Sequence, residues 1–67
     1  MNFTEKSLEI DIRDAITAND GRVRVSELNM MLGVDGWNLG SDKDFALLCK
    51  GLDFTVRVVE STLYVSL

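Results

Sequence analysis

Three arginines and a tyrosine occupy positions where short β-strands would hold them on one surface. Arg22 and Arg24 alternate with two valines, and such alternation of polar and apolar residues is typical of a half-buried strand. The register favoured for the C-terminal segment places Arg57 directly opposite Tyr64. Together the guanidinium groups and the ring could bind a phosphate backbone and a base. The alternative is a solvated sheet face with a cross-strand arginine–tyrosine pair and surface ion pairs.

Two lysines, Lys43 and Lys50, are seven residues apart in a predicted helix and therefore lie near the same face of it. We expect them to add to the contacts with phosphate. Asp42 and Asp44 lie close to the start of that helix, where carboxylates favour the helix dipole but repel an approaching phosphate. Base edges in a major groove are usually read by the N-terminal residues of a recognition helix, so this segment is poorly suited to sequence-specific reading of DNA.

Trp37 and Leu39 stand in a predicted loop before the same helix. A lone tryptophan in so small a domain usually packs as a lid over the core. If Trp37 is exposed beside Leu39 and Met30, it would instead anchor a protein partner, because interface hot spots favour tryptophan and arginine. The sequence leaves both roles open.

The chain lacks the groups on which most catalysis and metal binding depend. It contains no histidine and a single cysteine, Cys49, which falls on an apolar helical stripe where a thiol acts as a small buried hydrophobe. A zinc site would have to use Asp, Glu and one thiolate, and there is no Gly-rich phosphate loop. We therefore expect no enzyme activity and no bound metal or other cofactor.

The net charge of −4, from 11 acidic and 7 basic residues, argues against nucleic-acid binding, because domains with that function are usually basic. The location of the basic side chains therefore decides the question. Four carboxylates lie along the first predicted helix and form either a solvated acidic face or a surface for a basic partner: Glu5, Glu9, Asp11 and Asp14. Glu9 and Arg13 have the i, i+4 spacing of a helix-stabilising pair.

The length of 67 residues predicts one domain with a thin core, covering residues 1–67. No uncharged run approaches the ~20 apolar residues that a membrane span needs, and the N-terminus has no apolar signal core. We expect a protein that does not bind membranes and that works inside a cell, in the cytoplasm or, for a viral protein, in the host cytoplasm.

The first half of the chain predicts a helix, a short strand and a second helix. The first helix is capped by Thr4 and has an apolar stripe of Leu8, Ile12, Ala15 and Ile16. It ends at Asn19-Asp20-Gly21, where Gly21 can take the left-handed conformation. A strand follows over Arg22–Val25 with its valines inward. Ser26 then caps a helix with an apolar stripe of Leu28, Met31 and Leu32 that stops at Gly33.

The segment 34–40 has two internal glycines and no sustained period, so it is predicted to be a loop. An S-x-x-D capping pattern over 41–44 then starts a third helix, in which Ser41 accepts from a first-turn N–H and Asp44 reaches back. Its buried stripe is Phe45, Leu48, Cys49 and Leu52, and Gly51 lies where a terminator is expected.

The C-terminal segment 54–67 predicts a hairpin whose register can be tested. A two-residue turn at Glu60-Ser61 puts six apolar side chains on one face, to close the core: Phe54, Val56, Val58, Leu63, Val65 and Leu67. A slip of one residue would mix apolar and polar side chains. Glu-Ser is not a favoured pair for such a turn, so the loop length is less well defined than the register.

This order of elements resembles a winged helix-turn-helix, an α+β fold with a three-helix core, a small antiparallel sheet and a C-terminal β-hairpin wing. Within that superfamily the chain resembles the LOTUS, or OST-HTH, domain. The shared segments are Gly21-Arg-Val-Arg-Val-Ser-Glu-Leu28, Asp44-Phe45-Ala-Leu-Leu48, Asp53-Phe54-Thr-Val56 and Leu63-Tyr-Val65. The resemblance implies a module that binds RNA or docks on a helicase, and other winged helices bind DNA or proteins.

Two functions follow from these observations. The first is a non-enzymatic module that binds DNA or RNA mainly through the backbone, using Arg22, Arg24, Arg57 and Tyr64 with the two lysines of the third helix. The second is a protein–protein or regulatory module, including a homodimer, that uses the acidic helix or an exposed Trp37 patch.

Overall fold

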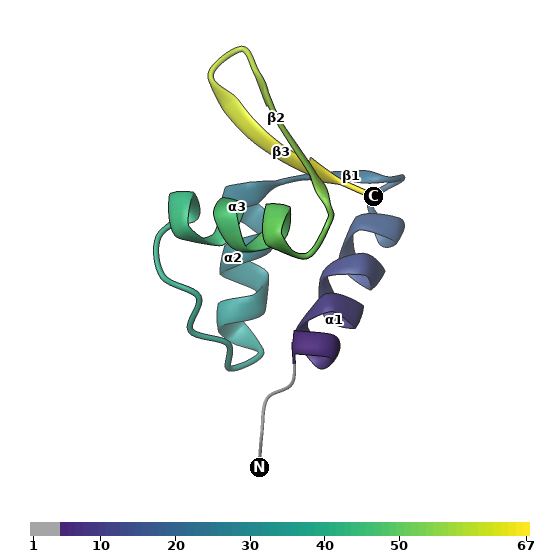
Figure 1. Ribbon diagram of the computed structural model, residues 1–67, viewed down its shortest axis with the longest axis vertical. Helices are drawn as coiled ribbons and strands as arrows, with labels where there is room; N and C mark the ends of the chain where they lie inside the picture. Colours follow the sequence, from purple (N-terminus) through teal and green to yellow (C-terminus); the bar gives the residue numbers. More distant parts are fainter. Residues whose placement is uncertain (1–4) are drawn as a thin grey trace.

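The computed structural model describes residues 5–67 and shows a small α+β domain of three helices and one three-stranded antiparallel sheet (Figure 1). The elements in chain order are α1 Glu5–Ala18, β1 Arg22–Arg24, α2 Val25–Val34, α3 Asp42–Gly51, β2 Thr55–Val59 and β3 Thr62–Ser66. The helices lie together beneath the sheet, and the β2–β3 hairpin projects beyond them (Figure 1). No helix in this described part of the chain is long and apolar enough to cross a membrane.

Helix α1 carries the apolar stripe that its periodicity predicts. Leu8, Ile12 and Ile16 are buried, and Ala15 packs against the same core at partial exposure. Residues spaced by three and four lie on one face of a helix, so this stripe faces the other helices. The predicted cap, Thr4, lies outside the described residues.

Helix α2 starts two residues earlier than predicted, because the chain leaves the sheet at Arg24. The N-cap is Arg24, with no side-chain cap bond, so the prediction that Ser26 is the cap is wrong. Val25 is the first helical residue and not the last strand residue, and its side chain is fully buried with that of Leu28. Met31 is 37% exposed, so it does not belong to the buried stripe as predicted.

The sequence predicts that α2 stops at Gly33, but the helix ends one residue later. The helix continues through Val34, and Gly36 takes the left-handed conformation at φ 101°. Its N–H donates to the Gly33 carbonyl at 3.1 Å, and the Trp37 N–H donates to the Leu32 carbonyl at 3.0 Å. These two bonds form a Schellman motif, which satisfies the last carbonyls of a helix.

The same motif ends α1 and α3, but an aspartate takes the left-handed position in each. Asp20 has φ 63° and Asp53 has φ 71°. The following N–H groups donate five residues back, from Gly21 to Ile16 and from Phe54 to Cys49. Gly51 was predicted to be the terminator of α3, but it is the last helical residue and Asp53 takes the left-handed position. Gly21 has the positive φ expected of it, 96°, and directly follows Asp20.

Helix α3 begins at the capping residue that the sequence predicts. The Ser41 hydroxyl accepts from the Asp44 backbone N–H at 3.2 Å. The return bond of the capping box, to the Asp44 carboxylate, is not formed among the described residues. Phe45 and Cys49 are fully buried and Leu48 packs partly against them, so the predicted stripe is confirmed.

The sheet has the strand order β1-β3-β2, with β3 paired to both neighbours. The predicted hairpin register is confirmed at all five ladder pairs from Thr55↔Ser66 to Val59↔Thr62. Glu60 and Ser61 form the turn at φ 50° and 67°, two left-handed residues in succession. That geometry fits the twist of a hairpin although neither residue favours it.

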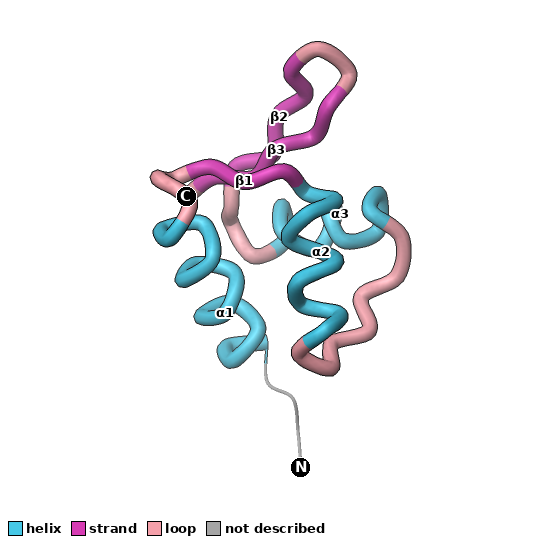
Figure 2. Tube along the Cα trace, turned by 180° about the vertical axis from the view of Figure 1, so that it is seen from behind, coloured by secondary structure: helices cyan, strands magenta, loops and turns pink. Residues whose placement is uncertain are grey.

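The inner face of the hairpin is buried only where helices lie beneath it. Val65 is fully buried and Phe54 is 6% exposed, but Val58 is 66% and Leu67 56% exposed. Seen from behind, the turn between β2 and β3 lies well away from the three helices (Figure 2). The prediction that all six apolar residues of this face close the core is therefore wrong for Val58 and Leu67.

Candidate functional site

Arginine and tyrosine side chains form a row across the outer face of the sheet. Arg24 on β1 and Arg57 on β2 are both paired in register with Tyr64 on the central strand β3. Opposed residues of antiparallel strands point to the same face. Val23 and Val65, one step along, are buried, so the row faces away from the helices.

Arg22 completes this surface, which we call the arginine face and define as Arg22, Arg24, Arg57 and Tyr64. The Arg22 guanidinium lies over the Tyr64 ring, with its carbon 4.2 Å from the ring centroid. Such a contact is a cation–π interaction, which orients both groups. The arrangement predicted from the alternation of residues is thus present in the folded chain.

None of the described carboxylates forms an ion pair with these arginines. Among the side chains that the structure describes, the only ion pair joins Arg13 to Glu9 on α1, at 2.8 Å. The strands β1, β2 and β3 contain three arginines and no acidic residue, a charge of +3. The whole chain carries −4, so the remainder carries −7. The charge is segregated, with the sheet as its positive part.

The edge of the arginine face near β1 is less positive than its centre. Arg22, Arg24 and Tyr64 line a hollow of about 400 Å³ together with Asp20 and Glu27. Two carboxylates here reduce the attraction for an anion. The side of the face toward Arg57 has no such neighbours on its own strand, whose other residues are threonine and valine.

The two lysines predicted to join this surface lie elsewhere. Lys43 and Lys50, both exposed on α3, line a different hollow with the inner-face residues Val58 and Leu63 of the hairpin. Inner and outer residues of a strand point in opposite directions. The six predicted nucleic-acid-binding residues therefore divide into four on the arginine face and two on the other side of the hairpin.

The position of Arg24 at the start of α2 was not recognised in the sequence. Its backbone is extended, φ −66° and ψ 138°, which is the geometry of an N-cap, but arginine supplies no cap bond. Ser, Thr, Asp and Asn are preferred there, and a positive charge at a helix N-terminus opposes the helix dipole. The sequence instead offered Ser26, a preferred capping residue, which lies two positions after the observed N-cap.

Trp37 and Leu39 belong to the packed body of the domain. Both are partly exposed and pack against the core cluster. The Trp37 indole N–H donates to the Asp11 carboxylate at 3.1 Å, which ties the loop before α3 to α1. This contact uses the polar atom of the ring and one carboxylate of the acidic helix, and it favours the packing role for Trp37.

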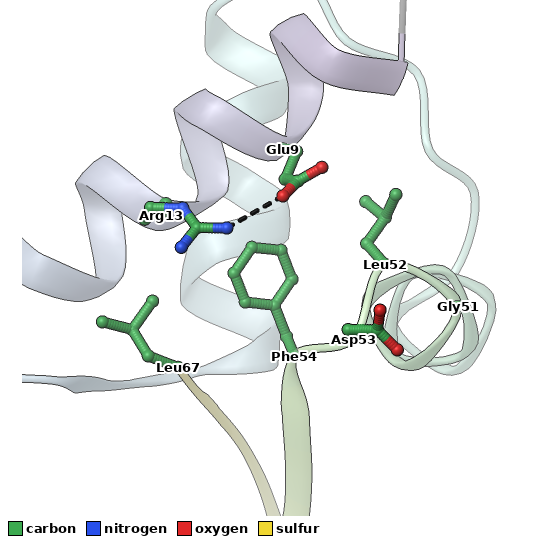
Figure 3. A pocket seen from close by; sticks show the side chains of 7 residues that line it. All are labelled: Glu9, Arg13, Gly51, Leu52, Asp53, Phe54 and Leu67. Carbon is green, nitrogen blue, oxygen red and sulfur yellow. Dashed lines mark hydrogen bonds and ion pairs between the residues drawn. The ribbon is translucent and has the colours of Figure 1, made fainter.

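A third hollow, of about 370 Å³, lies between α1 and the junction of α3 with β2 (Figure 3). Arg13 lies there beside Glu9 and Phe54, with its guanidinium carbon 5.5 Å from the Phe54 ring centroid. The predicted Glu9–Arg13 pair is confirmed. Since the cation already has a carboxylate and an aromatic partner, these contacts hold α1 against the start of the hairpin.

The single thiol lies in the core of the domain. Cys49 is fully buried, and removal from water raises its pKa from 9.0 to about 11. A thiol with a raised pKa is a poor nucleophile at neutral pH. Within the described residues, no group of three or more His, Cys, Asp or Glu side chains could hold a metal ion.

Comparisons of the chain with protein-family models, with curated proteins and with solved structures found no match.

Proposed function

We propose that this chain is a winged-helix domain that binds nucleic acid through the phosphate backbone, using the arginine face. The order helix, strand, helix, helix and hairpin supports the winged-helix interpretation, as does the three-stranded antiparallel sheet. In that interpretation α3 is the helix in the recognition position, and the β2–β3 hairpin is the wing.

The observation that carries the proposal is the row Arg24, Tyr64 and Arg57 across all three strands, in which neither arginine forms an ion pair with a described carboxylate. Guanidinium groups form bidentate hydrogen bonds with phosphate oxygens. Adjacent strands are about 4.8 Å apart, so two arginines on the outer strands are about 10 Å apart at their backbones. Long side chains can reach from there to neighbouring phosphates of one strand.

The contact between Arg22 and Tyr64 favours backbone binding over base stacking. One face of the Tyr64 ring is covered by the Arg22 guanidinium. The ring therefore holds a cation in place and has less area free to stack on a base. The acidic remainder of the chain repels phosphate, so a bound nucleic-acid strand is confined to the outer face of the sheet.

The location of Arg24 gives independent support. An N-cap position favours Ser, Thr, Asp or Asn, and the arginine found there contributes no cap bond. Residues that break a local rule of stability are expected at functional sites. Arg24 is thus explained by what it binds and not by what it stabilises.

The test is fluorescence anisotropy with labelled single-stranded and duplex DNA and RNA, from low to moderate salt. Two or three phosphate contacts give a slope of log K against log salt of about −2 to −3. We expect Arg57→Gln to weaken binding several-fold and to reduce the slope by about one contact. Lys50→Gln is the matched control, since it removes the same charge from the other side of the hairpin and should have little effect.

Two results would overturn the proposal. One is the absence of binding to all four probes at low salt. The other is an equal loss with Lys50→Gln and with Arg57→Gln, which would place the contact on α3 and not on the sheet.

Arg24→Asn separates function from stability. Asparagine is among the best N-cap residues, so we expect the variant to be more stable by about 1 kcal/mol in urea unfolding. The same variant should bind nucleic acid more weakly. Opposite signs exclude unfolding as the cause of the loss, and a variant that binds as tightly as the wild type contradicts a role for Arg24.

A further inference from the structure

An apolar groove runs between α3 and the inner face of the hairpin, on the side opposite the arginine face. It has a volume of about 530 Å³, and its lining includes Leu47 and Lys43 of α3 with Val58 and Leu63 of the hairpin. Ser61 at the turn also lines it. We call this feature the α3–hairpin groove.

The groove exposes large apolar side chains that the fold leaves without a partner. Leu47 is 60% exposed and Val58 is 66% exposed, whereas Leu63 is half-buried and packs against the core. Polar side chains in place of Leu47 and Val58 would leave the core packing unchanged. Contiguous apolar surface of this kind marks interaction sites in soluble proteins.

The charges beside the groove define the partner. Lys43, Leu47 and Lys50 have i, i+4, i+7 spacing, so the two ammonium groups flank one apolar side chain along the exposed face of α3. Neither lysine forms an ion pair with a described carboxylate. The lysines are separated by about 10 Å along the helix axis.

We propose that the α3–hairpin groove binds an acidic amphipathic helix of a partner protein. A short helix laid in the groove would insert apolar residues spaced by three and four between Leu47 and Val58. Carboxylates on the edges of that helix would meet Lys43 and Lys50. The length of α3, 10 residues or about 15 Å, matches two to three turns of such a helix.

Nucleic acid fits this groove less well than a helix does. Its lining is mostly apolar between the two lysines, and phosphate gains little from contact with Leu47 or Val58. The groove therefore favours a protein partner, while the arginine face, on the outer side of the same strands, stays free.

The experiment is an NMR titration of the full chain with a synthetic helical peptide of about 14 residues. The peptide carries leucines on one face and glutamates beside them, and a matched peptide carries lysines in place of the glutamates. We expect amide shifts at residues 43–50 and 56–63 with the acidic peptide only. The affinity should fall about tenfold, or ~1.4 kcal/mol, in Leu47→Gln.

Charge reversal and a control variant make the result specific. The double variant Lys43→Glu, Lys50→Glu should lose the acidic peptide and gain the basic one. Val34→Gln is the control, because Val34, 84% exposed, is the most exposed of the large apolar residues whose side chains the structure describes and lies at the end of α2. It should bind the acidic peptide as the wild type does.

Several outcomes would overturn this inference without touching the proposed function. They are equal binding of both peptides, loss of binding in Val34→Gln, shifts confined to the arginine face, and a wild-type dimer in sedimentation that Leu47→Gln dissociates. The last would make a second copy of the chain the occupant. Binding of a DNA duplex that Leu47→Gln abolishes would instead make the groove a nucleic-acid site, and this result alone would contradict both proposals.

Discussion

The base and the tip of the β2–β3 hairpin have the same alternation of side chains but opposite environments. At the base, Val65 is fully buried and Phe54 is 6% exposed. Toward the tip, Val58 lies on the same inner face as Val65 but is 66% exposed. The helices lie beneath the base and end before the tip (Figure 1). Alternation therefore identifies a face of a sheet, and burial depends on what packs against it.

The largest expected difference between base and tip is in the free energy of unfolding that is lost when a valine is replaced by alanine. Val65→Ala leaves a cavity in the core and should reduce the free energy of unfolding by about 2 to 3 kcal/mol. Val58→Ala should change it by less than about 0.5 kcal/mol, since the side chain is mostly in water. Urea unfolding of both variants measures the contrast. Equal losses would show that the tip is packed as tightly as the base.

The pH dependence of Cys49 sharpens the comparison at the base, where the Cys49 carbonyl accepts from the Phe54 N–H at 3.0 Å. Burial raises the pKa of this thiol from 9.0 to about 11, so the folded state holds the proton more tightly than the unfolded chain does. Its contribution to stability is therefore complete below about pH 9 and is lost between about pH 9 and 11. We expect the wild type to lose about 2 kcal/mol more than Cys49→Ala over this range.

A thiol at the tip is the control for that measurement. Val58→Cys in a Cys49→Ala background should react quickly with a disulfide reagent at neutral pH, because the position is exposed. Wild-type Cys49 should react only as fast as the domain opens. Similar rates for the two thiols would contradict the contrast in environment.

The entrance to the hairpin offers a stabilising change. Asp53 is left-handed at φ 71° and carries its negative charge at the C-terminal end of α3. Glycine adopts this conformation without strain, so Asp53→Gly should stabilise the domain by about 1 kcal/mol. Asp53→Asn removes the charge alone and should give a smaller gain. A loss of stability in Asp53→Gly would mean that the carboxylate makes a contact of its own.

The smallest expected effect is at the tip. Ser61 has φ 67° in the two-residue turn, and Ser61→Gly relieves that strain. Because the tip opens without the rest of the domain, the global gain should be under about 0.5 kcal/mol. Hydrogen exchange of the amides near the turn should slow more clearly than exchange at Val65. Equal slowing at both places would show that base and tip unfold together.

Much of the fold follows from patterns of a few residues. The stripe of α1, the Ser41 cap and the hairpin register were all predicted, because each depends on spacing within one element or on one turn. The end of α1 near Gly21, which has φ 96°, was predicted, but the left-handed residues Gly36 after α2 and Asp53 after α3 were not. A left-handed aspartate is determined by the tertiary path of the chain and has no strong local signal.

The candidate surfaces were predictable only in part. The four residues of the arginine face could be grouped because strand alternation and register fix which side chains share a face. The lysines of α3, named with them as nucleic-acid-binding residues, lie on the other side of the hairpin. Nothing in the sequence fixes the side of the hairpin on which α3 packs. The α3–hairpin groove needs that same information, and so it emerged only from the folded chain.

The place of β2 at the edge of the sheet has a consequence for solubility. Its outer backbone groups are unpaired, and its sequence Thr-Val-Arg-Val-Val is rich in residues that favour strands. Such an edge is a template on which other chains can add and aggregate. Arg57 is the only charge along it and therefore acts as a gatekeeper against self-association. The same side chain that we expect to bind phosphate would then also keep the free protein monomeric.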